Sequence, residues 1–430
     1  MKRWYECGSA DHALSRRQML GTLAGTAAVG ACGLSSLMQE TVAAEMKKQN
    51  RQVIFIWLDG GMSQFESWDP KPDSEFGGPF RTIPTSVPGV HISELMPHSA
   101  KLMHHLTVVR SMSTKDPNHS TGVARIQRGD PANRGVNYPY LGAAVTKLLG
   151  APANGLPPYM WIKPGSGGFI YQEAGFLGAK YGALALGEGK PPIHIQRPDT
   201  ISDADDAARN ELRRLANARF RLDRRESEVD AYEQSYDMAM QLMKRKELFD
   251  NSRLPAKDIA RYGTHPLGRH LLQARVLLEA GVQFIKVTSY HWDTHGDNFN
   301  MSQQLVPQID QPFAALIQDL ADRSMLDNVL VVLMSEFGRT PTINSRLGRD
   351  HWPDAWSLAL AGAGIRRGNI VGQTTKNGAW VDGEGYDVGH LFHTIFSALG
   401  INSKKIEYKN NGQPLPIARD DYEPIKLALA

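Results

Sequence analysis

Residues 53–61 read Val-Ile-Phe-Ile-Trp-Leu-Asp-Gly-Gly, a nearly continuous β-branched and aromatic run that ends abruptly in an acid and two glycines. The run predicts a β-strand that is covered on both faces, because a strand with one face in water alternates apolar and polar residues. Strands of this kind are typical of parallel sheets with helices on each side. The stretch therefore indicates an α/β fold.

Working outward from this strand, the chain alternates strands and helices. Apolar helical periodicity over 266–281 and about 304–323 predicts two helices, each directly before a strand. Strand, helix, strand in this order predicts parallel neighbours joined by right-handed crossovers. The expected fold is a doubly wound, mostly parallel central sheet with helices on both faces. Glycine-rich segments at 361–364 and 368–372 predict turns and a short strand, and the other strands are expected at 106–112, 158–162, 282–288 and 328–335.

Composition supports one large domain over residues 45–430. The chain has 430 residues and 41% hydrophobic content, enough for a sizeable core. Dense Arg, Asp and Glu among spaced apolar residues at about 200–250 predict a helical insertion with solvated faces. The net charge is only +3, and no basic stretch alternates with aromatics, so nucleic acid is not an expected partner.

The first 44 residues have the form of a twin-arginine export signal. Ser15-Arg16-Arg17-Gln18-Met19-Leu20 precedes a weakly apolar run at 21–37. This run falls short of the roughly 20 strongly apolar residues of a membrane-spanning helix, so no transmembrane span is expected in the mature form. We expect export by the twin-arginine machinery to the periplasm or cell surface.

Two ways of cleaving the signal stay open. Val42-Ala43-Ala44 suits a signal peptidase, whereas Val29-Gly30-Ala31-Cys32 resembles a lipoprotein box that would leave Cys32 lipid-anchored. Cys7 and Cys32 are the only cysteines in the sequence. The mature domain therefore has no disulfide or thiolate ligand, and its chemistry must use oxygen and nitrogen groups.

Polar clusters begin where several predicted strands end. The carboxyl ends of parallel strands lie side by side, and ligands bind in the crevice beside them. Carboxylates that meet there repel one another unless a cation or a basic partner such as Arg339 is present. Each residue also has an ordinary structural explanation, such as a turn at Asp59 or a helix cap at Asp350. The candidate metal ligands are Asp59, Asp293, His295, Asp297, Glu336, Asp350 and His351.

Four motifs in fixed order carry a family resemblance. They are Asp59-Gly60-Gly61-Met62-Ser63-Gln64 through Trp68-Asp69-Pro70-Lys71-Pro72, Trp292-Asp293-Thr294-His295-Gly296-Asp297, Ser335-Glu336-Phe337-Gly338-Arg339-Thr340-Pro341 and Gly348-Arg349-Asp350-His351-Trp352. Together they resemble the secreted family called domain of unknown function 1501, which is similar in layout to the alkaline phosphatase and sulfatase superfamily. That superfamily binds two metals with carboxylates and histidines at strand ends.

The resemblance implies a role for several residues. Asp59 matches the first-strand aspartate, Asp293 with His295 the first-metal pair, Glu336 the late-strand acid and His351 the final histidine ligand. The Asp293–His295 spacing is two where the superfamily has four, and Phe337 replaces a ligand histidine. One metal, two unusually coordinated metals or none remain open; zinc, manganese, magnesium and calcium are the candidate ions.

The superfamily nucleophile lies at a helix start after the second strand. Ser113, Thr114, Ser120 and Thr121 fall in that window, and the resemblance favours Thr114 or Ser113, with His119 close to the site. An ordinary polar loop that caps the next helix is the alternative. Arg339 is expected to stabilise charge on the transferred group.

Two functions follow from these residues. The first is an exported metal-dependent hydrolase of phosphate or sulfate esters, acting on a small-molecule or glycan ester. The second is a non-catalytic exported protein that uses the same fold to bind a glycan or a surface partner.

Overall fold

The computed structural model describes residues 51–129, 135–150, 152, 154–191, 197–221, 226–250 and 254–430. The predicted export segment, with Cys7 and Cys32, lies outside these residues. Within them, every helix is too short or too polar to cross a bilayer.

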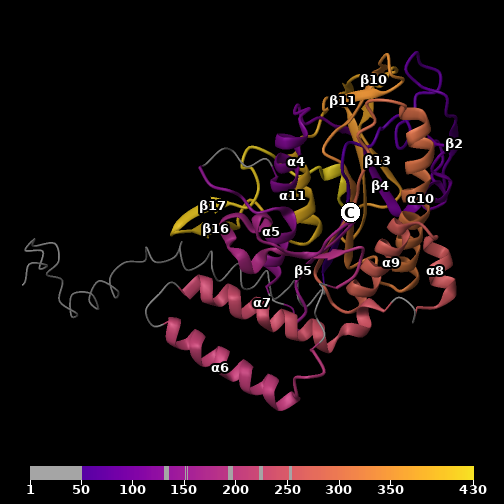
Figure 1. Cartoon of the computed structure of the whole chain (residues 1–430). Helices are drawn as coiled ribbons and strands as arrows, with labels where there is room; N and C mark the ends of the chain where they lie inside the picture. Colours follow the sequence, from indigo (N-terminus) through magenta and orange to yellow (C-terminus); the bar gives the residue numbers. More distant parts are fainter. Residues whose placement is uncertain are drawn as a thin grey trace, which may run out of the picture.

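A nine-stranded sheet forms the centre of the molecule, in the order β13-β4-β12-β9-β1-β8-β5-β7-β6 (Figure 1). Strand β1 (Gln52–Leu58) lies between β8 (Phe284–Ser289) and β9 (Val329–Met334) and is parallel to both. Parallel pairing continues from β8 to β5 (Tyr159–Lys163) and β7 (Ala183–Gly187). The mostly parallel sheet expected from the sequence is confirmed.

One strand interrupts the parallel order between β9 and β4 (Leu106–Met112). This strand, β12 (Trp356–Gly362), is antiparallel to both neighbours. The turn predicted within 361–364 lies at 363–364, because β12 continues through Gly362. Its Ser, Ala and Gly residues lack the β-branched signature of the other strands. Because β4 and β9 are each antiparallel to β12, they run in the same direction and end at the same edge of the sheet.

Helices cover both faces of the sheet, as predicted. Alternate residues of β1 point to opposite sides. Ile54, Ile56 and Leu58 pack into one core with α9 (Pro266–Glu279) and α10 (Asn298–Asp322). Val53, Phe55 and Trp57 pack into a second core with α5 (Leu141–Leu149) and α11 (Val388–Ala398). Figure 1 shows these two helical layers on either side of the strands.

Other elements lie around this framework. Helix α10 begins at Asn298 rather than near residue 304, because polar residues between Phe299 and Met301 and at 302–304 obscure the apolar periodicity of its first two turns. The charged segment near 200–250 contains α6 (Asp203–Arg221) and α7 (Glu226–Lys244), side by side at the bottom of the view in Figure 1. The remaining elements include α3 (Pro97–Lys101), α4 (His119–Arg128), α8 (Ala256–Tyr262), β2 (Thr82–Pro84), β3 (His91–Ser93), β6 (Gly168–Ile170), β10 (Gly338–Ile343), β11 (Arg349–Trp352), β13 (Asn369–Val371), β14 (Gln373–Thr374), β15 (Val381–Asp382), β16 (Glu407–Asn410) and β17 (Gln413–Pro416).

Candidate metal centre

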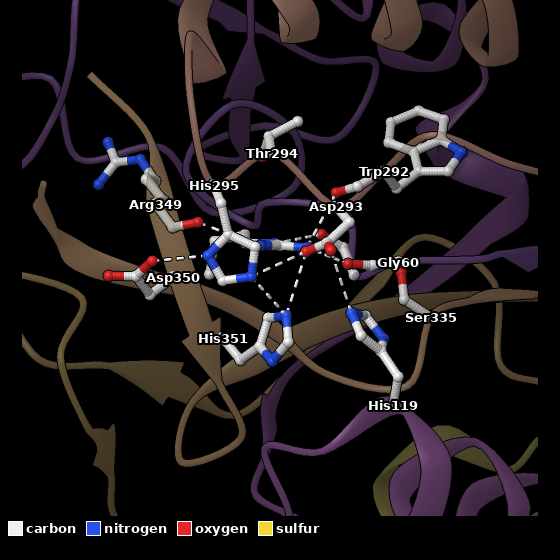
Figure 2. A network of polar contacts seen from close by, with 12 residues as sticks. Gly60, His119, Trp292, Asp293, Thr294, His295, Ser335, Arg349, Asp350 and His351 are labelled. Atoms are coloured by element: carbon white, nitrogen blue, oxygen red, sulfur yellow. Dashed lines mark hydrogen bonds and ion pairs between the residues drawn. The ribbon is translucent and has the colours of Figure 1, made fainter. Parts of the chain in front are cut away.

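Three histidines from separate segments surround one aspartate (Figure 2). His119 is the first residue of α4, after β4, and His351 lies on β11. Asp293 and His295 lie in the loop between β8 and α10. The shared edge of the sheet thus brings together residues that are more than 200 positions apart in the chain.

The ring Nε2 atoms of the histidines approach the Asp293 carboxylate. His295 Nε2 and His351 Nε2 each lie 3.1 Å from Asp293 Oδ1, and His119 Nε2 lies 3.4 Å from Oδ2. The two Nε2 atoms of His295 and His351 are 2.9 Å apart. In the described part of the chain, His119, Asp293 and His351 form a group whose ligand atoms all lie within 4.8 Å of one another.

The opposite nitrogen of each histidine is held by an oxygen acceptor. His119 Nδ1 donates to Glu336 Oε1 at 2.7 Å, and His295 Nδ1 donates to Asp350 Oδ1 at 2.6 Å. His351 Nδ1 donates to the Pro117 carbonyl at 2.6 Å. Carboxylate and carbonyl oxygens only accept, so each neutral ring carries its proton on Nδ1 and its lone pair on Nε2. Metal-binding histidines are oriented by such contacts.

These tautomers leave lone pairs facing one another. The 2.9 Å contact between the His295 and His351 Nε2 atoms is repulsive unless a proton or a cation lies nearby. His119 Nε2 is buried and makes no hydrogen bond, although Asp293 Oδ2 is 3.4 Å away. Three imidazole nitrogens and a carboxylate are ligands that suit zinc and other transition metals. The residues present therefore fit a divalent metal.

Arg339 holds the Asp293 carboxylate in place by an ion pair. Its NH2 donates to Asp293 Oδ1 at 2.7 Å, and the guanidinium is fully buried. Burial opposes ionisation of Asp293, but the hydrogen bond and charge of Arg339 lower its pKa to about 2. Arg339 therefore holds the aspartate ionised, and no part of its side chain is exposed. Its other acceptors are the carbonyls of Gly60, Gly61, Trp292 and Arg349.

Glu336 connects His119, a candidate metal ligand, to the turn after the first strand. Its Oε1 accepts from the Gly60 amide at 3.0 Å and from His119 Nδ1. Burial raises the pKa of Glu336, while the hydrogen bond from His119 opposes this rise. The same hydrogen bond raises the pKa of His119 above its ordinary value, against the effect of burial. Glu336 thus contacts a candidate ligand through Oε1, while its Oε2 is buried without a hydrogen-bond partner among the described residues.

Four other predicted site residues make no described contact with the three histidines. Asp59 Oδ1 accepts from Trp57 Nε1 at 2.8 Å, and exposed Asp297 accepts from Asn300 Nδ2 at 2.7 Å. The buried Thr114 hydroxyl accepts from Trp356 Nε1 at 3.3 Å. The Ser113 amide donates to the Tyr386 carbonyl, and among the described contacts its hydroxyl has none with the histidines.

Two features of the centre are not apparent from the sequence pattern. One is the Pro117 carbonyl, which holds His351, since any residue supplies a backbone carbonyl. The other is the position of Phe337, whose ring centroid lies 4.3 Å from that of His351 and 5.0 Å from that of His119. An apolar ring thus packs against two of the candidate ligands. The sequence shows a phenylalanine at this place in the motif, but it does not show the contact of that ring with the histidines.

Solved structures similar to this chain include sulfatases and an alkaline phosphatase. A PsFucS1 sulfatase from Pseudoalteromonas sp. is 13% identical, with a TM-score of 0.37 over 85% of this chain and 72% of that chain. The lipoteichoic acid synthase LtaP from Listeria monocytogenes is 9% identical, with a TM-score of 0.36 over 86% and 75%. The alkaline phosphatase from the Antarctic bacterium TAB5 is 12% identical, with a TM-score of 0.35 over 81% and 98%.

A comparison with curated proteins gave no match. The family described as "Protein of unknown function (DUF1501)" matches residues 50–428, nearly the whole of the described domain. This match agrees with the four motifs quoted from the sequence. The chain therefore belongs to the DUF1501 family.

Proposed function

We propose that the protein is a metal-dependent hydrolase of phosphate or sulfate esters with a single metal centre. The observation that carries this proposal is the arrangement of His119, His295 and His351, whose Nε2 atoms converge on Asp293 while their Nδ1 atoms are held by acceptors. One metal is favoured over two because Asp59 points to Trp57 and Phe337 fills the adjacent position.

The ligand types favour zinc, or manganese among the other candidates. Magnesium and calcium prefer sites built from oxygen ligands, whereas imidazole nitrogens suit zinc and transition metals. A bound divalent metal supplies Lewis acidity that polarises an ester oxygen and lowers the pKa of water. The side chains of Asp293, His295 and His351 remain 43%, 33% and 18% exposed, which leaves access for an ester.

Other residues of the chain orient the candidate ligands and keep Asp293 ionised. Glu336, Asp350 and the Pro117 carbonyl orient the imidazoles, and Arg339 keeps Asp293 ionised. Because the hydroxyls of Ser113 and Thr114 have no described contact with the centre, water is the proposed nucleophile. Water adds to phosphorus or sulfur, the bond to the ester oxygen breaks, and the alcohol leaves with a proton.

The test combines metal analysis with turnover. The purified full-length protein is analysed for bound metals and assayed with 4-nitrophenyl phosphate, bis(4-nitrophenyl) phosphate and 4-nitrophenyl sulfate. We expect about one metal per chain and hydrolysis of at least one ester. His351→Ala should lose both, whereas His91→Ala, which replaces an exposed histidine on β3, should lose neither.

The alternative, a non-catalytic binding protein, predicts a different result. It is favoured by the same observation, that the hydroxyls of Ser113 and Thr114 have no described contact with the histidines. Bound metal without turnover of any ester would support binding alone, and absence of metal in the protein as purified and after zinc addition would contradict the proposed centre.

We further propose that the protein is exported by the twin-arginine route, on the basis of Arg16-Arg17 and the apolar run that follows. Replacing both arginines with lysine should retain the protein in the cytoplasm. Cell fractionation distinguishes this outcome from an unaffected distribution, which would contradict the twin-arginine assignment.

A further inference from the structure

A cavity lies near the candidate metal centre, on the face of the sheet that carries α4 and α5. Its volume is about 270 Å³. Side chains from β1, β5 and β8 form its floor, and α4 forms one wall. Tyr140, Trp161 and Tyr290 line it with aromatic rings. A cavity of this size accommodates a single small ring rather than a long chain.

The charge of the buried lysine in this cavity is already balanced by neighbouring groups. Lys286 is 2% exposed and donates to Gln127 Oε1 at 2.7 Å and to Glu173 Oε1 at 2.8 Å. Its ammonium also lies 4.1 Å from the centre of the Trp161 ring. These contacts satisfy the charge of Lys286, so it shapes the cavity and leaves ligand recognition to other groups.

Two charged side chains in the lining keep unused hydrogen-bonding capacity. Among the described residues, Arg128 has no acidic partner and no hydrogen-bond acceptor; its guanidinium lies 5.0 Å from the centre of the Tyr140 ring. Asp59 uses Oδ1 to accept from Trp57, which leaves Oδ2 as an acceptor. A planar donor and a planar acceptor beside aromatic rings match a ligand with neighbouring hydroxyl groups and an apolar face.

Two segments of the chain connect the cavity with the candidate metal centre. The Asp59 carbonyl accepts from the Trp292 amide, and the next residue, Gly60, donates to Glu336. Helix α4 begins at the candidate ligand His119 and reaches the cavity with Gln127 and Arg128. Arg128 lies nine residues after His119 in this helix, roughly 13 Å away at about 1.5 Å per residue, so Asp59 marks the end of the cavity nearer the candidate metal centre.

We propose that this cavity binds a monosaccharide ring, the alcohol part of a sugar phosphate or sugar sulfate. The aromatic rings contact the apolar face of the sugar, and Arg128 and Asp59 bond to its hydroxyls. The inference about the ester rests on the proposed function, whereas sugar binding itself does not require the metal.

Binding is tested first without the metal, which separates this proposal from the proposed function. The full-length protein, stripped with EDTA, is titrated with D-glucose, D-galactose, L-fucose and D-glucuronate while tryptophan fluorescence and heat are recorded. We expect millimolar binding of at least one sugar, with a fluorescence change from Trp57 or Trp161. Inorganic sulfate and 4-nitrophenol serve as probes that lack a sugar ring and should not compete.

Variants locate the binding site. Asp59→Asn and Arg128→Gln should each weaken sugar binding about tenfold or more, since each removes a charged hydrogen-bonding group. Arg219→Gln, on the exposed part of α6, is the matched control and should bind as the unmodified protein does. Circular dichroism and thermal unfolding establish that the variants fold.

Three results would overturn the proposal. They are no binding of any of the sugars, binding that Asp59→Asn and Arg128→Gln leave unchanged, and equal competition by inorganic sulfate or 4-nitrophenol, which lack a sugar ring. Loss of metal or ester turnover in other experiments would leave the sugar-binding result intact. Where turnover is present, these variants should raise KM for sugar esters more than for 4-nitrophenyl esters.

Discussion

At the scale of single residues, Glu336 offers a test of the orienting contacts. Glu336→Gln keeps the shape of the side chain but removes the charge that holds His119 Nδ1–H. Loss of such a partner typically weakens metal binding by roughly 10- to 100-fold. Competition with a coloured chelator measures the affinity. Glu75→Gln, which replaces an exposed glutamate, is the control, and equal affinities in the two variants would contradict the role of Glu336.

The raised pKa of His119 predicts how metal binding depends on pH. The hydrogen bond to Glu336 favours the protonated ring, so protons compete with the metal at a higher pH than for an ordinary histidine, near 6.5. Affinity should therefore be complete above the raised pKa and fall as the pH drops through it. In Glu336→Gln the fall should begin at lower pH. Titrations from pH 8 to pH 5 with the same midpoint in both proteins would refute this explanation.

The positions of residues directly after strands predicted part of the candidate metal centre. The sequence did not predict the direction in which each side chain points. Asp293, His295 and His351 meet, as their places at strand ends and in the family motifs indicated. Asp59 also follows a strand, yet its carboxylate turns toward Trp57, two residues back. Whether an acid at a strand end turns toward one side of the edge or the other depends on a local partner that spacing does not reveal. The direction of the Arg339 side chain was also not predictable, because its acceptors are mostly backbone carbonyls, which any residue supplies.

At the scale of elements, the turn after β1 depends on glycine. Gly60 has φ of 119°, and a Cβ atom at this position would lie 2.5 Å from the Asp293 amide nitrogen. Gly60→Ala should therefore displace the loop that carries Asp293, destabilise the protein by about 1–3 kcal/mol and weaken metal binding. Gly89→Ala is the matched control, since its φ is 78° but its added Cβ meets nothing within 4 Å. Urea unfolding and metal titration compare the two variants; equal effects would show that backbone strain alone explains the loss.

The strands that carry the site were predictable because they are buried on both faces. Predicted and observed bounds agree within about one residue at β1, β4 and β9, whose runs are rich in Val, Ile and Leu. Strand β12 was missed because its small residues give no β-branched run. The start of helix α10 was predicted about six residues too late because polar residues interrupt the apolar pattern of its first two turns. Sequence patterns report burial, so elements without a strong apolar pattern are the ones that they miss.

At the scale of the whole molecule, convergence of the site depends on strand direction rather than on strand order. Strand β12 separates β4 from β9, but its antiparallel pairing with both leaves their carboxyl ends at one edge. His119 after β4 can therefore contact Glu336 after β9 across an intervening strand. The sequence predicted that these clusters share one edge of the sheet, although it did not predict β12. This was possible because the polar clusters follow strands that run in one direction.

A metal that joins these segments should stabilise the entire domain. His119, Asp293 and His351 come from three parts of the chain, so unfolding destroys the centre and releases the ion. With free metal at about 1,000 times Kd, binding contributes about 4 kcal/mol, which corresponds to roughly 5–10 °C in Tm for a domain of this size. Thermal unfolding after EDTA treatment, followed by addition of zinc, measures the shift. Asp293→Asn should abolish the response to zinc, whereas Asp297→Asn should retain it, because Asp297 bonds to Asn300 away from the histidines. An equal zinc response in both variants would mean that the ion binds elsewhere, since only Asp293 lies between the three imidazoles.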